Sequence, residues 1–178
     1  MRKVILYIAQ SLDGYISGTD GNLDWLPQQI FEKMNEFYSE FFQQVDTILI
    51  GRNTYDQIIN VLSPNQWPYP NKTSYVWTSQ KIDSLYDSVH FVDTDLVTFV
   101  NKIKKQEGKD IWVLGGATLA TELIKNNLID EYCITIVPVI LGKGISLFPQ
   151  ENYNTIFLEM KSCFTENGMI QTHYIVEL

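Results

Sequence analysis

The sequence has few cysteines, few histidines and no surplus of positive charge. Its 178 residues include two cysteines and two histidines, and the formal net charge is −8. Cys133 and Cys163 form no CxxC pair and no Cys/His metal spacing, so we predict two buried, reduced thiols and no metal site. His90 and His173 offer no metal pair and are interpreted as structural. Because a duplex-binding protein needs a basic face, the negative charge argues against a nucleic-acid partner.

The sequence also lacks an apolar run long enough to cross a membrane or to form a signal-peptide core. The first apolar run covers residues 4–9 and is followed at once by Gln10, Ser11 and Asp13. A run of that length is typical of a buried strand. We therefore expect a cytoplasmic protein with no membrane partner. The hydrophobic fraction of 45% is ordinary for a globular protein, and we expect one domain over residues 1–178.

Three familiar motifs are missing as well. No third glycine completes a GxGxxG pattern around Gly115, and no GxSxG elbow is present. Lys143 does not belong to a Walker A motif, because Gly144 follows it instead of Ser or Thr. A phosphate-bearing ligand of so acidic a chain would need a local site, built from a few basic residues, backbone N–H groups and a helix N-terminus.

Alternating strand and helix patterns predict an α/β fold. Strands are expected at 4–9, 47–50, 73–78, 89–92, 111–114, 133–140, 156–164 and 169–176, and helices from Pro27 to Val45 and at 55–62, 96–105 and 117–127. Asn167-Gly168 favours a type I′ turn between the last two strands. This order predicts a mostly parallel, eight-stranded mixed sheet with helices on both faces and a C-terminal antiparallel hairpin.

Two strand-to-helix junctions are the best candidates for a phosphate site, since ligands of open α/β sheets bind beyond the carboxyl ends of the strands. In ILIGRNTY, Gly51 permits close approach of the backbone, Arg52 supplies a planar cation and Thr54 a hydroxyl. In WVLGGATL, paired glycines at 115–116 precede residues 117–119, whose free N–H groups suit a pyrophosphate. Each motif alone is weak, because a solvated arginine would explain the first and a tight turn the second.

Four motifs in order make the chain resemble the dihydrofolate reductase superfamily. They are SLDGYI after the first strand, ILIGRNTY after the second, WTSQ after the third and WVLGGATL after the fifth. The stretch DEYCITIVPVILGKGISLF is similar to stand-alone domains that resemble the C-terminal reductase domain of the bifunctional riboflavin biosynthesis deaminase/reductase. The resemblance spans essentially the whole chain. It implies an NADPH-dependent oxidoreductase and, together with the apolar late strands ending in ITIVPVIL, a homodimer.

The resemblance also assigns cofactor residues. Arg52 and Thr54 would hold phosphates, and Thr78 and Ser79 would reach the ribose 2′-phosphate. Ala9 and the 13–16 loop would lie against the nicotinamide, and the Gly115-Gly116 peptide would be cis. The full set of expected cofactor positions is Ala9, Gly14, Ile16, Gly51, Arg52, Thr54, Thr78, Ser79, Gly115, Gly116, Ala117, Thr118 and Leu119.

Candidates for substrate binding and proton transfer are fewer. Asp13 and Asp24 are the loop carboxylates nearest the expected nicotinamide and are the candidate catalytic residues, although each also fits a turn or cap role. Trp25, Phe31 and Tyr38 are the candidate substrate contacts. Trp25 would cover a heterocycle while Asp24 accepts its N–H. The aromatic stripe of the first helix fits either a well-buried helix or one edge of a flat pocket.

Two positions depart from the pattern of the relatives. Dihydrofolate reductases have an acidic residue early in the first helix, where this chain has Gln29, and riboflavin-pathway reductases usually have Glu where it has Leu114. These departures argue against the substrate of dihydrofolate reductases and against that of the riboflavin-pathway reductases. From the resemblance we still expect hydride transfer from NADPH to a small pteridine- or pyrimidine-like substrate. The alternative is a non-catalytic nucleotide-binding or pterin- or flavin-binding module.

Overall fold

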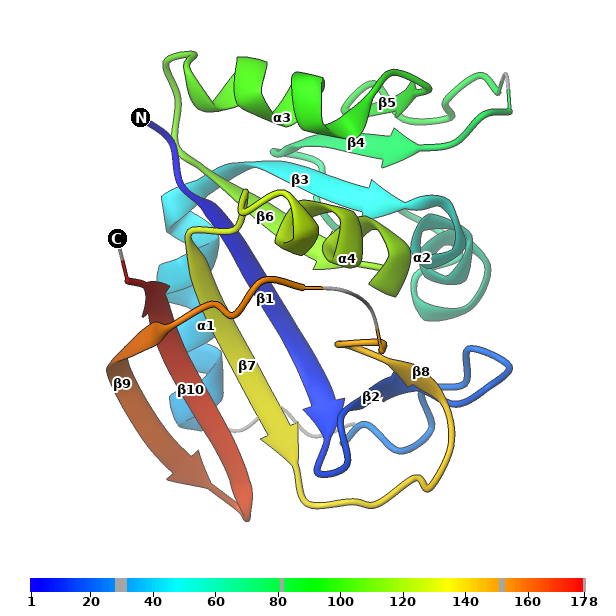
Figure 1. Cartoon of the computed structure of the whole chain (residues 1–178). Helices are drawn as coiled ribbons and strands as arrows, with labels where there is room; N and C mark the ends of the chain where they lie inside the picture. The colour runs from blue at the N-terminus through cyan, green and yellow to red at the C-terminus, as the bar shows by residue number, and fades with distance from the viewer. Residues whose placement is uncertain (28–31, 81, 151–152, 178) are drawn as a thin grey trace.

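The computed structural model describes residues 1–27, 32–80, 82–150 and 153–177. Its main sheet has eight strands in the order β5-β4-β3-β6-β1-β7-β10-β9 (Figure 1). The strands are β1 (Val4–Ser11), β3 (Val45–Gly51), β4 (Thr73–Trp77), β5 (Val89–Val92), β6 (Asp110–Gly115), β7 (Glu131–Val137), β9 (Leu158–Glu166) and β10 (Met169–Val176). All pairs from β5 to β7 are parallel, whereas β10 is antiparallel to both β7 and β9. The predicted mixed sheet with a C-terminal hairpin is confirmed.

Helices cover both faces of this sheet. They are α1 (Glu32–Gln44), α2 (Arg52–Gln57) with its π-helical continuation η1 (Ile58–Leu62), α3 (Leu96–Lys104) and α4 (Ala117–Lys125). In Figure 1, α4 crosses in front of the sheet and α1 lies behind it. Within β1, Val4 and Leu6 pack on the α3 and α4 side, and Ile5 packs on the α1 and α2 side. Burial on both faces accounts for the continuous apolar run of this strand.

None of the helices in the described ranges has the length and apolar character needed to span a bilayer.

Several element boundaries differ from the predicted ones. The strand expected to end at Ile140 ends at Val137, because Pro138 has no N–H to donate to a neighbouring strand. The first helix ends at Gln44, and Val45 opens β3. It was expected to begin at Pro27, but Pro27 is not helical, and residues 28–31, between Pro27 and Glu32, lie outside the described residues.

A second, two-stranded sheet was not predicted. It consists of β2 (Tyr15–Ser17) and β8 (Ile145–Ser146), which pair antiparallel through Tyr15 and Ser146. Gly144 permits this pairing, because a Cβ at that position would lie 2.2 Å from the Ser17 carbonyl oxygen. Pairing in the small sheet holds the segment after β7 next to the segment after β1.

The two cysteines lie in different environments. Cys133 is buried in β7, as predicted, but Cys163 is exposed on β9, so the prediction of two buried thiols is wrong for Cys163. The reason is position in the sheet, since β9 is the edge strand and pairs only with β10. The surrounding residues Leu158 and Met160 are exposed for the same reason.

Candidate functional site

The two strand-to-helix junctions singled out in the sequence lie side by side in the structure. Strands β3 and β6 are parallel neighbours, and Ile50 pairs with Gly115, so both chains leave the sheet at the same edge. A Cβ on Gly51 would lie only 3.1 Å from the backbone nitrogen of Gly116. The absence of side chains therefore lets the two backbones touch. We call the set Gly51, Thr54, Gly115 and Gly116 the glycine junction.

Side chains from β1 and α2 close around the glycine pair. The Gly115-Gly116 peptide is cis, as the resemblance implied, and Gly115 has a φ of 141°. The Thr54 hydroxyl oxygen lies 3.1 Å from the place where a Cβ on Gly116 would be. The Ile8 Cδ1 atom and the Thr54 hydroxyl oxygen each lie 3.7 Å from a Cβ built on Gly115. Sequence reasoning missed Ile8, although it shares the face of β1 on which Leu6 is buried.

Helix α4 presents uncapped backbone donors at this junction. Its N-cap residue is Gly116, and no side chain in the described part of the chain caps it. The first N–H groups of a helix have no intrahelical partner, and here they belong to Ala117, Thr118 and Leu119. None of these three side chains is acidic, so nothing in the first turn repels an anion.

Arg52 lies between the helix that it opens and the loop after β4. Its Nε atom donates to Asp56 at 2.7 Å, and its Nη1 atom donates to Gln80 Oε1 at 3.2 Å. The guanidinium also lies 5.9 Å from the centre of the Phe91 ring. Gln80 directly follows Ser79, so Arg52 is brought beside the segment expected to reach the 2′-phosphate. The Asp56 carboxylate holds the guanidinium in place and partly offsets its charge.

Thr78 and Ser79 follow β4 at the same edge of the sheet. The Thr78 backbone N–H donates to the Val92 carbonyl at 3.0 Å, and the Thr78 hydroxyl accepts from the Gln80 N–H at 3.2 Å. Ser79 is exposed. Sequence reasoning missed Gln80 and Asp56. The four-residue spacing between Arg52 and Asp56 was a usable signal on a helix, whereas nothing local pointed to Gln80.

Asp13 is held by hydrogen bonds that cross from β1 to the loop after β7. Its carboxylate accepts the Ser11 hydroxyl at 2.7 Å, the Gly142 N–H at 2.7 Å and the Leu141 N–H at 3.1 Å. These bonds, with the Ser11 hydroxyl first, lower the pKa of Asp13 below its usual value. The carboxylate is therefore ionised at neutral pH and fixes the turn that contains Gly14. The backbone of Gly14 also accepts the Leu147 N–H at 3.0 Å.

Asp24 and Trp25 lie in a separate loop. Asp24 is exposed and accepts the Asn22 side-chain amide at 2.7 Å. The loop is tied to α2, because the Gln57 side chain donates to the Gly21 carbonyl at 2.7 Å. The Trp25 indole nitrogen is buried and has no hydrogen-bond partner among the described residues. The Trp25 ring is half-buried, so this loop contains an indole N–H that donates to no described residue.

The remaining candidates are spread over β1, β2 and α1. Tyr38 belongs to the aromatic cluster beneath α1, with its ring 5.8 Å from Tyr7 and 6.0 Å from Trp112. Ile16 packs against the core on the α3 and α4 side. Ala9 is half-buried and pairs with Thr135 of β7. Phe31 and Gln29 lie outside the described residues.

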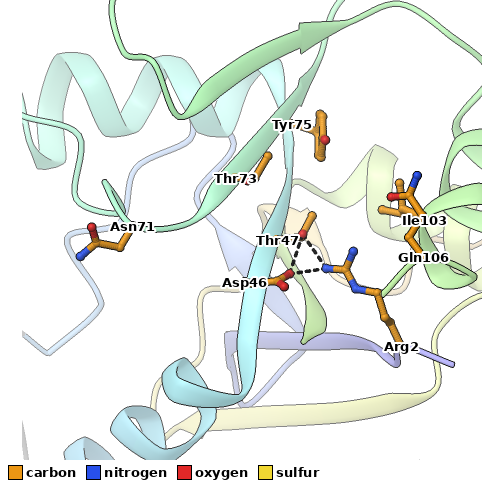
Figure 2. A pocket seen from close by; sticks show the side chains of 8 residues that line it. All are labelled: Arg2, Asp46, Thr47, Asn71, Thr73, Tyr75, Ile103 and Gln106. Carbon is orange, nitrogen blue, oxygen red and sulfur yellow. Dashed lines mark hydrogen bonds and ion pairs between the residues drawn. The ribbon is translucent and has the colours of Figure 1, made fainter. Parts of the chain in front are cut away.

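A cavity lies at the opposite end of the strands, around the amino ends of β3 and β4 (Figure 2). Its volume is about 310 Å³. Arg2 lines this cavity, but its guanidinium already has partners. The Nη2 atom pairs with Asp46 and donates to Thr47 Oγ1 at 2.6 Å. The Asp46 carboxylate neutralises this cation, as Asp56 partly does for Arg52. The glycine junction differs because the uncapped N-terminus of α4 adds free N–H donors.

The chain matches a family model along nearly its whole length. Residues 2–171 match the model of the RibD C-terminal domain. Two uncharacterized proteins of Bacillus subtilis are similar over nearly their full lengths. YwjB is 41% identical over 174 residues, covering 98% of each chain. YyaP is 36% identical over 185 residues, covering 97% of this chain and 94% of its own.

Solved structures agree with this match. A protein of Shewanella sp. PV-4, provisionally assigned to riboflavin biosynthesis, is 27% identical with a TM-score of 0.80, covering 99% of both chains. The deaminase/reductase of Thermotoga maritima is 16% identical with a TM-score of 0.69, and the match covers 98% of this chain and 56% of that one. Dihydrofolate reductase from Enterococcus faecalis, complexed with NADP(H), is 19% identical with a TM-score of 0.67 over 97% of its chain. The last two likenesses show the fold alone.

Proposed function

The chain belongs to the RibD C-terminal domain family, and from this membership and the glycine junction we propose that it is a cytoplasmic NADPH-dependent reductase. The observation that carries the proposal is the meeting of two junctions at one sheet edge, where the backbones of Gly51 and Gly116 touch beside the uncapped end of α4. A dinucleotide has a pyrophosphate and a long flat body, so it needs close access to backbone donors. The glycine junction offers the close access through its bare backbone and the donors through the first N–H groups of α4.

The residues present fit the cofactor. The N–H groups of Ala117, Thr118 and Leu119 would hold the pyrophosphate, with the Thr54 hydroxyl beside them. Arg52 would turn from Asp56 and Gln80 to a phosphate at the adenosine end, where Thr78 and Ser79 lie. Bidentate binding of phosphate by a guanidinium favours NADPH over NADH.

Bound NADPH would supply the hydride, and the protein would orient the substrate and exclude water. Ala9, Gly14 and Ile16 would line the nicotinamide end. Asp13 would act there by fixing the turn, because its carboxylate already accepts hydrogen bonds from Ser11, Leu141 and Gly142. Asp24 or a water molecule would then supply the proton, and Trp25 and Tyr38 would contact the substrate.

We propose a small pteridine- or pyrimidine-like heterocycle as the substrate. Leu114 stands directly before the glycine pair and packs against the apolar core on the α1 and α2 side. An aliphatic side chain at that place favours an aromatic ligand over a charged one. The alternative function, a binding module for nucleotides, pterins or flavins without turnover, would use the same site.

We also propose that the protein is a homodimer. The apolar segment expected to associate, ITIVPVIL, is mostly inside the fold, with Ile134 and Val137 buried and Ile140 exposed. The edge strand β9 and its surroundings offer a larger apolar surface, in which Phe157 is 68% exposed and Met160 is 51% exposed. Large exposed apolar side chains that gather in one patch are typical of an interface.

Titration of tryptophan fluorescence with NADPH and NADH tests the cofactor proposal. The wild type should prefer NADPH, and Arg52→Ala should weaken NADPH binding by at least about tenfold while leaving NADH binding nearly unchanged, because only the phosphate contact is lost. Lys105→Ala, an exposed cation at the end of α3, is the matched control. If neither dinucleotide binds at millimolar concentration, the proposal is wrong.

Turnover separates the enzyme from the binding module. Oxidation of bound NADPH should be followed by absorbance with a panel of pterins, pyrimidines and quinones. Steady oxidation with one member supports the reductase. Binding without oxidation by any of them supports the alternative.

A further inference from the structure

The cavity at the amino ends of β3 and β4 takes no part in the proposed cofactor site. Its volume of about 310 Å³ lies within the range of about 300–1,000 Å³ that is typical of small-molecule sites. The lining comes from the segment before β1, the amino ends of β3 and β4, and the end of α3 (Figure 2). Parts of the chain that are far apart in the sequence therefore border one space.

Arg2 supplies a cation whose position in this lining is fixed. Its side chain is only 7% exposed, and its Nε atom donates to the Lys109 carbonyl. Its Nη2 atom pairs with Asp46 and donates to Thr47 Oγ1. Gly108 leaves room for this pair, because a Cβ there would lie 2.8 Å from Asp46 Oδ2 and 3.2 Å from Arg2 Cζ. The guanidinium is thus oriented before any ligand binds.

One terminal nitrogen of this guanidinium has no protein partner. A guanidinium has five N–H groups, and the contacts to Lys109, Asp46 and Thr47 use the three on Nε and Nη2. The two on Nη1 donate to no residue in the described part of the chain, and this atom is not sealed from solvent. In Figure 2 it points away from Asp46, towards the space between Tyr75 and Gln106. Unused N–H groups of a buried cation need an acceptor at the cavity wall, either water or a ligand atom.

The uncharged part of the lining adds further donors around the same space. Thr73 and Tyr75 contribute hydroxyl groups, and Gln106 contributes an amide. None of these three side chains makes a hydrogen bond with a described residue. Ile103 adds an apolar wall, which is continuous with the core on the α3 and α4 side. The cavity therefore offers several unused donors and a small apolar surface beside them.

The acidic residue of the described lining, Asp46, does not cancel the positive charge around the cavity. Its two oxygens already accept from Arg2 and from the Lys109 backbone N–H. Another cation lies next to them, because the Lys72 Nζ atom donates to the Val45 carbonyl at 2.6 Å. Burial, followed by the charge of Lys109, lowers the pKa of Lys72, whereas Asp46 raises it, so these three charges lie within range of one another. One carboxylate is thus shared by three cations.

The unused Nη1 group selects among anions. Both edges through which a guanidinium binds a carboxylate in bidentate fashion include Nη2, and Asp46 and Thr47 already occupy that atom. A phosphate group carries three acceptor oxygens that point in different directions, so it needs no such planar edge. An anion with a phosphate group therefore fits the remaining donors better than a carboxylate does.

We propose that the cavity is a second ligand site and that it binds a small phosphomonoester. The phosphate accepts from Arg2 Nη1 and from the hydroxyl groups of Thr73 and Tyr75. The organic part lies against Ile103. This site is separate from the glycine junction and does not depend on the proposed reductase function.

Chemical-shift mapping of the ¹⁵N-labelled protein, with glycerol 3-phosphate as the probe, tests the site. The backbone amides of 46–47, 73–75 and 103–109 should shift, with saturation at millimolar concentration. Glycerol should produce no shifts there, and glycerate, which carries a carboxylate instead of a phosphate, should bind at least about tenfold more weakly. Inorganic phosphate lacks the organic part and should also bind more weakly. Equal affinity for glycerate or for inorganic phosphate would overturn the assignment to a phosphomonoester.

Two variants remove single donors without changing the charge. Tyr75→Phe keeps the ring and Thr73→Val keeps the shape, and each should weaken binding of glycerol 3-phosphate about fivefold. Arg2→Leu combined with Asp46→Asn removes the cation together with its partner and should abolish the binding. Lys105→Ala is the control, because it removes one exposed positive charge outside the lining and should change the affinity less than about twofold.

The dispersion of the amide spectrum shows whether each variant is folded, so loss of binding is read only from folded proteins. Wild-type affinity in both Tyr75→Phe and Thr73→Val would overturn the proposal. Largest shifts outside the three segments would overturn it as well. Because no NADPH is present in these titrations, such a failure would leave the cofactor proposal intact.

Discussion

At the scale of single residues, the lack of a side chain at Gly51 shapes the candidate site as much as the side chains that are present. Gly51 has ordinary extended torsions, with φ at −75° and ψ at 150°, so its backbone conformation does not require glycine. What requires glycine is contact, because the atom that a Cβ would meet is the Gly116 backbone nitrogen at 3.1 Å. That nitrogen belongs to the turn that opens α4 and cannot move independently.

Gly51→Ala should therefore damage the site and the fold together. The added methyl group would push the two junctions apart, at a cost of about 1–3 kcal/mol in the free energy of unfolding. NADPH affinity should fall at least about tenfold, since the donors of α4 would shift. Urea unfolding and fluorescence titration measure the two effects. Asn53→Ala, at an exposed position of the same helix, should change neither, and a fully stable Gly51→Ala protein with normal affinity would contradict the close-contact account.

The residues of the candidate site that the sequence revealed are those in local motifs. Gly51, Arg52 and Thr54 stand next to one another after a strand, and the glycine pair stands at a similar junction. Gln80, by contrast, reaches Arg52 from 28 positions away, and no local pattern marks it. The cavity around Arg2 was invisible for the same reason, because the pairing of Arg2 with Asp46 joins the segment before β1 to the start of β3.

At the scale of elements, a buried charged group fastens β7 to β10 and to the start of β1. The Glu131 carboxylate accepts the His173 Nε2 atom at 2.8 Å and the Lys3 Nζ atom at 2.5 Å. The hydrogen bond from His173, followed by that from Lys3, lowers the pKa of Glu131 below its ordinary value of 4.5. The same carboxylate is 8% exposed in its side chain, so these bonds are sheltered from water.

The stability that Glu131 contributes should depend on pH. Its pKa is lower in the folded than in the unfolded protein, so the contribution is complete above about pH 4.5 and is lost as the pH falls through the folded value. Glu131→Gln should cost about 2 kcal/mol near neutral pH and progressively less in acid. Thermal unfolding of both proteins across the acid range measures this. The exposed Glu159→Gln on β9 is the control, and a constant difference between wild type and Glu131→Gln at all pH values would contradict the account.

Elements marked by a local sequence pattern were predictable, and very short strands that depend on distant partners were not. The strands 89–92 and 169–176 match their predicted bounds, because alternation and the Asn167-Gly168 turn mark them locally. Both turn residues have positive φ, 49° and 81°, as a type I′ turn requires. Strands β2 and β8 have three and two residues and lie far apart in the sequence. Their existence depends on the tertiary fold, which no local periodicity records.

At the scale of the whole molecule, the order of the strands decides where chemistry can occur. Strands β3 and β6 are far apart in sequence but adjacent in the sheet, and this adjacency joins two weak motifs into one site. The motifs predicted the two halves, and the family resemblance predicted that they meet. A single domain over residues 1–178 stays a prediction.

The proposed homodimer is tested at this scale by light scattering. The wild type should have about twice the chain mass of 20.6 kDa. Met160→Glu should give the mass of one chain, because a charge on the edge strand would have to be buried in the interface. Leu85→Glu replaces an apolar residue that is 83% exposed elsewhere and should stay dimeric. A monomeric wild type would contradict the proposal.

The central claim is that NADPH binds at the glycine junction, and the most direct measurement is chemical-shift mapping of the ¹⁵N-labelled protein during NADPH titration. The account predicts that the largest shifts fall on backbone amides of 51–54 and 115–119. Absence of shifts in both segments at saturating NADPH, or largest shifts around Arg2 and Thr47 at the other end of the strands, would contradict it.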